Sequence, residues 1–152
     1  MGINLTEQAH IVSVLAPTAA TSATGSDWVK LENAAHVTFI VQTGSITNSS
    51  TVICQEGTSS AGSGATAIAY SYSRTTAAGD TWSVLADATA SGIALGTTND
   101  VMLAIELSAD DLSDGSPWVN LQFSTAATIQ IGAVAILSGV RYQGEQTPTA
   151  IS

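Results

Sequence analysis

The chain has 152 residues, the size of one ordinary domain that can bury a hydrophobic core without disulfides or a metal. Only 10% of its residues are charged, and 12 Asp and Glu against 3 Lys and Arg give a net charge of −9. This balance excludes nucleic acid and anionic membrane surfaces as partners, because both are bound mainly through Lys and Arg. No apolar run reaches the ~20 residues of a membrane-spanning helix.

Small and hydroxylated residues replace the missing charges: the chain holds 19 Ser, 20 Thr and 24 Ala. Disorder is excluded, because 45% of the residues are hydrophobic and β-branched residues are frequent. Thr, Val and Ile suit a pleated surface, so the composition favours a β protein.

In chain order, a polar N-terminal arm (residues 1–8) precedes a run of short strands. The clearest strand spans 36–42, where Val37, Phe39 and Val41 alternate with more polar positions. The other strands are predicted over residues 10–15, 28–31, 51–55, 67–72, 81–85, 101–107, 118–123 and 129–142. One helical turn is expected at 108–112, where Ser108 and Asp111 have the spacing of a capping box.

Turn residues separate these segments, and no helix-length pattern alternates with the strands. The sequence therefore predicts an all-β fold: an antiparallel β-sandwich of about eight strands, jelly-roll-like. We expect a single domain over residues 1–152, with residues 1–8 and 143–152 as extended terminal arms.

Residues that could support catalysis are few. His10 and His36 are the only histidines, each in or beside a predicted strand, and no Gly-x-Ser-x-Gly elbow occurs. Cys54, the single cysteine, lies in an apolar run, where a small buried hydrophobe is the expected role. The sequence predicts neither an enzyme nor a cofactor, although a triad built from distant segments stays open.

A weak metal candidate is the acidic turn of Asp110, Asp111 and Asp114. An EF-hand beginning at Asp110 would place Leu112 and Leu121 where oxygen ligands are required, so that motif fails. A looser calcium site remains open beside the simpler interpretation of a solvated acidic turn.

Tryptophans offer a candidate contact surface. Val119, Leu121 and Phe123 form one face of a predicted strand, so Trp118 is expected to face outward, towards another chain. A sugar-stacking platform formed with Trp28 and Trp82 is the alternative.

The order of several segments resembles a known group of proteins. These segments are residues 10–17, the strand at 28–33 running into 36–40, the turn at 106–112, and the end of the chain from Arg141-Tyr142 to Thr147-Pro148-Thr149-Ala150-Ile151. Together they are similar to small virion structural proteins of tailed bacteriophages, most of all to capsid decoration (cement) proteins.

The resemblance implies a non-enzymatic protein of the virion, made in the host cytoplasm, that binds the outer surface of the capsid and stabilises it. Its partners would be the major capsid protein and further copies of itself, with a trimer favoured. The candidate interface residues are Ile3 and Leu5 in the N-terminal arm, Ile151 in the C-terminal arm, and Arg74, Trp118 and Arg141. The alternatives are another virion component (tail-tube, collar or head-fibre protein) and a carbohydrate-binding β-sandwich module.

Overall fold

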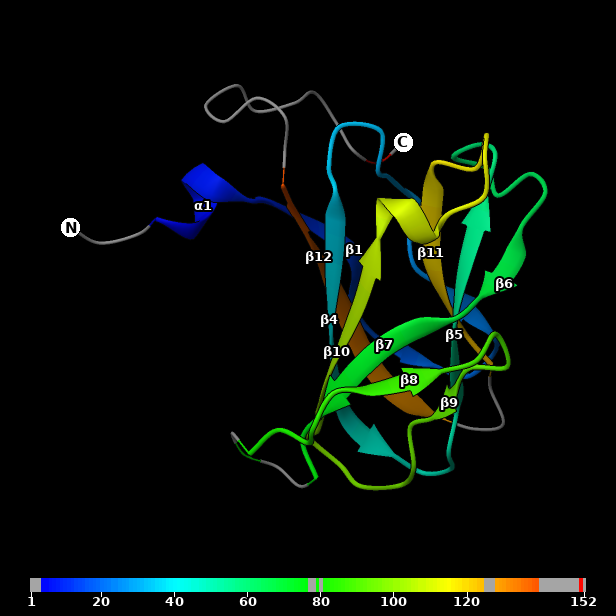
Figure 1. Cartoon of the computed structure of the whole chain (residues 1–152). Coiled ribbons are helices and arrows are strands. Elements are labelled where there is room, and N and C mark those ends of the chain that lie inside the picture. The colour runs from blue at the N-terminus through cyan, green and yellow to red at the C-terminus, as the bar shows by residue number, and fades with distance from the viewer. Residues whose placement is uncertain (1–3, 77–78, 80, 125–127, 140–150, 152) are drawn as a thin grey trace.

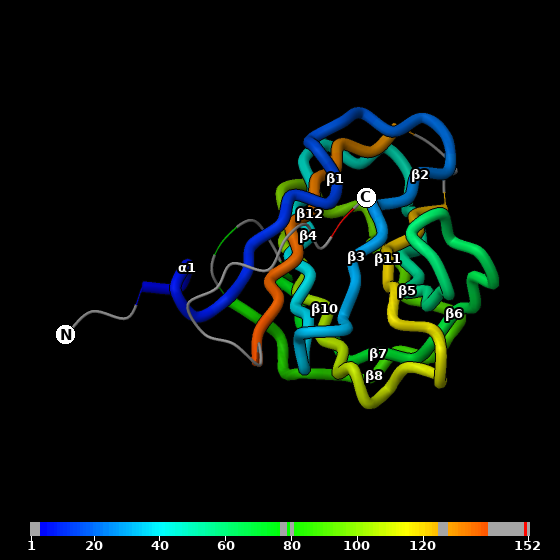
Figure 2. Tube along the Cα trace, turned by 90° about the horizontal axis from the view of Figure 1, so that it is seen from above, coloured from blue at the N-terminus to red at the C-terminus, as the bar shows by residue number. Residues whose placement is uncertain are grey.

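A computed structural model describes residues 4–76, 79, 81–124, 128–139 and 151 of the chain. The described residues form twelve strands, all paired antiparallel, in two layers (Figures 1 and 2). Sheet A has the order β1 (His10–Ala20), β12 (Ile129–Ser138), β4 (His36–Ile46), β10 (Met102–Ser108), β7 (Tyr70–Arg74) and β8 (Ala86–Ala88).

Sheet B has the order β2 (Thr24–Gly25), β11 (Trp118–Phe123), β5 (Thr51–Gly57) and β6 (Thr66–Ile68). Two shorter strands join it, with β3 (Val29–Lys30) paired to β11 and β9 (Ile93–Ala94) paired to β5. The described helical segments are α1 (Leu5–Gln8) and the 3-10 turn η1 (Ala109–Asp111). Neither has the length or apolar character needed to cross a membrane.

The core lies between the inner faces of the two sheets. Every second residue of the long strands is buried, as the alternation predicts. Phe39 on β4 and Ile105 on β10 come from sheet A, while Leu121 and Phe123 on β11 come from sheet B, and all four are inaccessible to solvent. The all-β class and the two-sheet sandwich expected from the sequence are confirmed, with twelve described strands instead of about eight.

The predicted strand at 81–85 is wrong. Trp82 forms a single isolated bridge with Thr75, and Val84 is 88% exposed. The alternation of Trp82 and Val84 imitates a half-buried strand, but a strand also needs a neighbour along its length. Here the regular pairing begins only at β8.

The single strand predicted over 67–72 is divided in two. Ile68 on β6 pairs with β5 in sheet B, whereas Tyr70 on β7 pairs with β8 in sheet A. The chain passes from sheet B to sheet A at Ala69. The inward side chains of both strands pack at the same core, so the alternation of inward and outward residues continues from one sheet into the other.

The short helical elements agree in part with the sequence. The turn expected at 108–112 is present as η1, with the capping box of Ser108 and Asp111. The N-terminal arm, expected to be extended, contains the one-turn helix α1. In the C-terminal arm only Ile151 is described.

Candidate interaction face

The outer face of sheet A carries apolar side chains where a solvent-facing sheet normally carries polar ones. Its middle row runs from Val134 on β12 through Ile40 on β4 to Ala104 on β10, directly opposite one another in the register. Ile136 and Met102 occupy the adjacent rows, all at half-buried positions. We call these five residues the apolar face. Side chains at opposite positions of neighbouring strands touch, so they form one continuous surface.

At the β1 edge this surface is extended by Ile11, which pairs with Ile136 and is 44% exposed. The members of the apolar face point away from the core residues on the same strands. An antiparallel sheet with one solvated face is expected to be polar there, so this composition makes the face a candidate contact surface.

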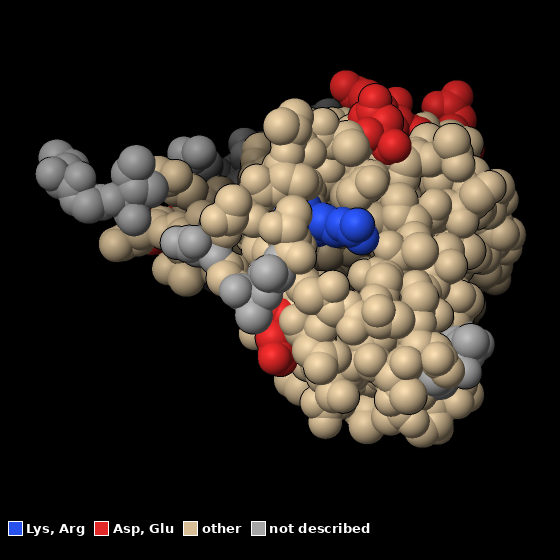
Figure 3. Space-filling view, turned by 90° about the horizontal axis from the view of Figure 1, so that it is seen from below, with Lys and Arg blue, Asp and Glu red and all other residues tan. Residues whose placement is uncertain are grey.

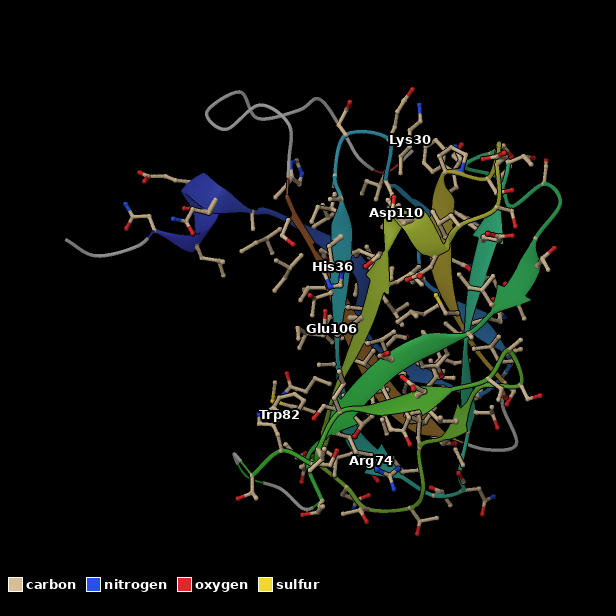
Figure 4. The ribbon with its side chains drawn as sticks, in the orientation of Figure 1. Lys30, His36, Arg74, Trp82, Glu106 and Asp110 are labelled. Atoms are coloured by element: carbon tan, nitrogen blue, oxygen red, sulfur yellow. The ribbon has the colours of Figure 1, made fainter. Side chains whose placement is uncertain are left out.

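One ionic cluster interrupts the apolar face. His36 Nε2 lies 2.6 Å from Glu106 Oε2, and Thr38 Oγ1 donates to the same oxygen at 2.7 Å. Figure 4 shows His36 and Glu106 side by side on β4 and β10. The His Nδ1 is 3.4 Å from Ser108 Oγ. The carboxylate of Glu106 is therefore held by two neighbouring side chains on β4.

Ser108, His36 and Glu106 bring together the residue types of a hydrolytic triad, which the sequence left open. The serine contact is long, and Ser108 also caps η1 through the capping box. Neither of the two hollows described below is lined by any of the three residues.

A groove of about 510 Å³ lies on the β1 side of the same face. It forms because β1 bulges away from β12 between Ser13 and Leu15 and again between Leu15 and Thr18. Pro17 sits over Gly132, where an added Cβ would lie 3.3 Å from the proline ring. We call it the β1 groove; its lining is Ser13, Leu15, Pro17, Thr18, Ala19, Ile40, Gln42, Thr43, Gly44, Asp100, Gln130, Ile131, Gly132, Ala133 and Val134.

The lower end of the sandwich carries Trp82 and Arg74 (Figure 4). Trp82 is 40% exposed, and the Arg74 guanidinium is exposed and donates to the carbonyl of Ala94 at 3.2 Å. Figure 3 shows this end as largely neutral, with acidic side chains towards the rim of the view. Arg74 is thus an exposed cationic side chain, and its pairing with an acidic partner stays a prediction.

At the upper end, Trp118 is half-buried and points away from the core, as predicted, since Val119 and Leu121 beside it are fully buried. The Lys30 ammonium lies 5.8 Å from its ring centroid and also pairs with Glu32. Trp118 therefore already has an intramolecular cation–π partner. Trp28 packs over Gly57, which pairs with Trp118, so these two tryptophans are neighbours while Trp82 lies at the opposite end.

The acidic turn is used for local structure. Asp111 Oδ2 accepts a hydrogen bond from the amide of Ser108 at 3.1 Å. Just beyond η1, buried Glu56 accepts a hydrogen bond from the amide of Ser113 at 2.8 Å and so holds the loop against the core. Asp110 and Asp114 are exposed, and no cluster of three potential metal ligands occurs in the described ranges. A smaller hollow of about 260 Å³ adjoins this loop.

Two titratable side chains lie inside the core. Burial raises the pKa of the Cys54 thiol to about 12, so the buried hydrophobic role predicted for this residue is confirmed. Burial likewise raises the pKa of the Tyr70 hydroxyl, which donates to the carbonyl of Val52 at 2.8 Å. Neither group is a reactive site at neutral pH.

The candidate residues of the arms divide into three groups. Leu5 is 51% exposed on α1, in agreement with an interface role. Ile151 is partly buried against the core of its own chain, so in this conformation it is not presented to a partner. Ile3 and Arg141 lie outside the described residues. The apolar face itself was missed from the sequence. Met102 and Ala104 take two of the three outward positions in residues 101–107, but Ile40 is the one apolar residue among the four outward positions of residues 36–42.

The fold and surface together define the class as an all-β sandwich with a charge-poor contact face. Comparison of the chain with protein-family models, with curated proteins and with solved structures finds no match.

Proposed function

We propose that the protein is a non-enzymatic structural component of a bacteriophage virion, which binds the outer surface of the capsid and stabilises it. The observation that carries this proposal is the apolar face on the outside of sheet A. Among the described residues, the charged side chains on that side are the His36–Glu106 pair, Asp87 at the β8 edge and Asp100 in the β1 groove. The phage capsid as partner comes from the family resemblance of the sequence.

The physical case rests on how a sheet face meets its partner. Burying apolar surface stabilises a contact at roughly 25 cal/mol per Å², whereas exposed ion pairs contribute little and weaken with salt. A face with Ile40, Val134 and Ile136 at its centre is therefore suited to a broad protein surface. Its affinity should depend only weakly on ionic strength, which suits a contact repeated many times over a shell.

Several finer parts of the proposal rest on the resemblance alone. These are the major capsid protein as partner, the trimeric state and the location on the outside of the capsid, whereas the jelly-roll-like architecture is proposed from the strand spacing of the sequence. A different virion component with the same sandwich would use the same face for ring or fibre contacts between its own copies.

The test is a co-sedimentation assay with shells assembled from the major capsid protein alone. Ala104→Asp places a charge at the centre of the apolar face, and Ala90→Asp places the same charge in the exposed turn between β8 and β9. We expect Ala104→Asp to weaken shell binding at least tenfold and Ala90→Asp to bind like the wild type, with little change between 50 and 500 mM salt. Wild-type protein that fails to bind shells, or equal binding by the two variants, would overturn the proposal.

Imaging of purified virions separates the remaining alternatives. Density for about 15 kDa recurring over the shell is the expected result. Density confined to the tail or collar would assign the protein to another virion part. For a carbohydrate-binding module, glycans would protect the fluorescence of Trp82, the most exposed tryptophan, from quenching.

A further inference from the structure

The N-terminal helix has little support from its own chain. Within α1 no residue is buried, and the helix projects away from the sandwich, with β1 as its neighbour (Figures 1 and 2). Leu5 in its first turn is half exposed. A four-residue helix is not stable by itself in water, because too few hydrogen bonds offset the cost of forming the first turn. This segment therefore has the properties of an arm whose partner is another molecule.

The β1 groove has the chemistry to receive such an arm. Ile40 and Val134 supply apolar surface, and Leu15 and Pro17 lie on the bulged strand beside them. The amides of Gln42 and Gln130 in the lining can donate to, or accept from, the backbone of a peptide.

Charge also permits the contact between two acidic chains. Asp100 is the one charged residue of the groove lining. Among residues 4–9 the one charged side chain is Glu7, whose carboxylate already accepts a hydrogen bond from Asn4 at 3.1 Å. Two copies that each carry a net charge of −9 repel one another over most surfaces, and this pair of surfaces largely avoids that repulsion.

A chain cannot fill the far part of its own groove with Leu5. From His10 to Thr18 the bulged strand β1 runs beside Leu137 to Ile131 of β12, a distance of about 20 Å at ~3.3 Å per residue. If residues 5–9 turned back along the sheet, they would span at most about 17 Å. The groove beyond Leu15 is thus open to the arm of another copy.

We propose that Leu5 and α1 of one copy occupy the β1 groove of a second copy. The contact joins two different surfaces, so it is heterologous and closes into a ring when the rotation between copies permits, as in a trimer. The proposal deepens the proposed function, in which several copies bind one shell. The arm covers Ile40 and Val134 on the β1 side of sheet A, so the capsid contact is made through the rest of the apolar face, which is Ile136, Met102 and Ala104.

Sedimentation analysis tests the arm with two matched variants. Leu5→Asp changes an arm leucine that is 51% exposed, and Leu85→Asp changes a leucine that is 59% exposed outside the groove. We expect the wild type and Leu85→Asp to form the same oligomer, and Leu5→Asp to require at least tenfold higher concentration to assemble. A wild type that stays monomeric, or equal assembly by the two variants, would contradict the proposal.

Cross-linking between separately labelled copies locates the contact. Leu5→Cys protein is mixed with Thr18→Cys protein and treated with a short bismaleimide, while Ala90→Cys replaces Thr18→Cys in the control. Cys54 is buried and does not compete. Cross-linked dimers are expected only in the first mixture, and equal yields in both mixtures would contradict the groove as the site. If the cross-link forms but no variant binds shells, only the proposed function fails; if monomers bind shells without the cross-link, only the arm contact fails.

Discussion

The outer faces of the two sheets differ although their inner faces are alike. Both inner faces carry fully buried apolar residues, such as Phe39 in sheet A and Leu121 in sheet B. The outer side of sheet B carries the side-chain amides of half-buried Gln55 and Gln122 and of buried Asn120, and Trp28 covers its upper part at Gly57. The outer face of sheet A instead presents the apolar face.

This difference separates two roles of apolar residues in one small protein. Inward apolar residues hold the sheets together, and their loss must destabilise the isolated chain. Outward apolar residues on sheet A contribute little to the stability of the isolated chain. Their substitution should therefore weaken binding to a partner more than it lowers stability. Substitutions at adjacent positions of one strand can test this separation directly.

The largest expected effect comes from β4, where Phe39 and Ile40 point to opposite faces. Phe39→Ala should lower the free energy of unfolding by about 3–5 kcal/mol, because it removes a fully buried ring and leaves a cavity. Ile40→Ala should cost less than about 1.5 kcal/mol, since only partial burial is lost. Urea unfolding of both variants measures the difference, and similar losses would show that the outer face is part of the stabilising core.

Alkaline pH should lower the stability of the chain through Cys54, which is buried on the inner face of sheet B. The pKa of Cys54 rises from 9.0 in an exposed thiol to about 12 in the folded chain, because burial disfavours the thiolate. Its contribution to stability is therefore complete below pH 9 and disappears as the pH rises towards 12, a loss on the order of 4 kcal/mol.

Unfolding midpoints between pH 7.5 and 11 should fall more steeply for the wild type than for Cys54→Ala. A shallower fall remains in the variant, because the pKa of buried Tyr70 is also raised. Parallel pH profiles for the two proteins would contradict the assigned role of the thiol. In the native wild type at pH 8, the thiol should also be inert to Ellman's reagent until denaturant is added.

A smaller effect is expected where Trp28 covers sheet B. A Cβ added to Gly57 would lie 2.9 Å from Trp28 Cζ3, too close for unstrained contact. Gly57→Ala should therefore destabilise the chain by about 1–3 kcal/mol through overpacking. Adding Trp28→Phe should recover part of that loss, because the smaller ring leaves room. Strictly additive effects in a double-mutant cycle would show that the two residues do not press on each other.

The smallest effect concerns the ion pair on the outer face of sheet A. His36 and Glu106 keep 34% and 32% of their side-chain surface exposed, so solvent screens their attraction. Glu106→Gln should change stability by about 0.2–1 kcal/mol at low salt and by less at high salt. Thermal unfolding in 20 mM and 500 mM salt measures this change in stability. A loss above 2 kcal/mol would contradict the prediction and mean that the pair contributes strongly to the stability of sheet A.

Alternation in the sequence predicted much of the fold. The inward positions of residues 36–42, 101–107 and 118–123 followed from a period of two, and the burial of Cys54 followed from the apolar run around it. The strand at 81–85 could not be rejected from the sequence, because alternation shows which side chains share a face and does not show whether a neighbouring strand exists. The division at Ala69 was equally hidden, since the period continues unbroken from one sheet to the other.

The candidate contact surface was less predictable. Leu5 and Arg74 were named from their residue types and are exposed, whereas Ile151 packs against its own core. His36 and Glu106 are 70 residues apart, and only the pairing of β4 with β10 brings them together. The β1 groove depends on bulges in an edge strand, which leave no local periodic signal.

The sequence by itself determined a charge-poor, acidic, all-β chain and the inward residues of its main strands, because composition and side-chain alternation are local properties. Only the tertiary structure decided which strands are neighbours, and therefore that Val134, Ile40 and Ala104 align in one row. Strand pairing depends on contacts between distant segments, and each of these three residues alone is an ordinary exposed-face position. Their alignment turns scattered apolar residues into a surface that can bind another protein.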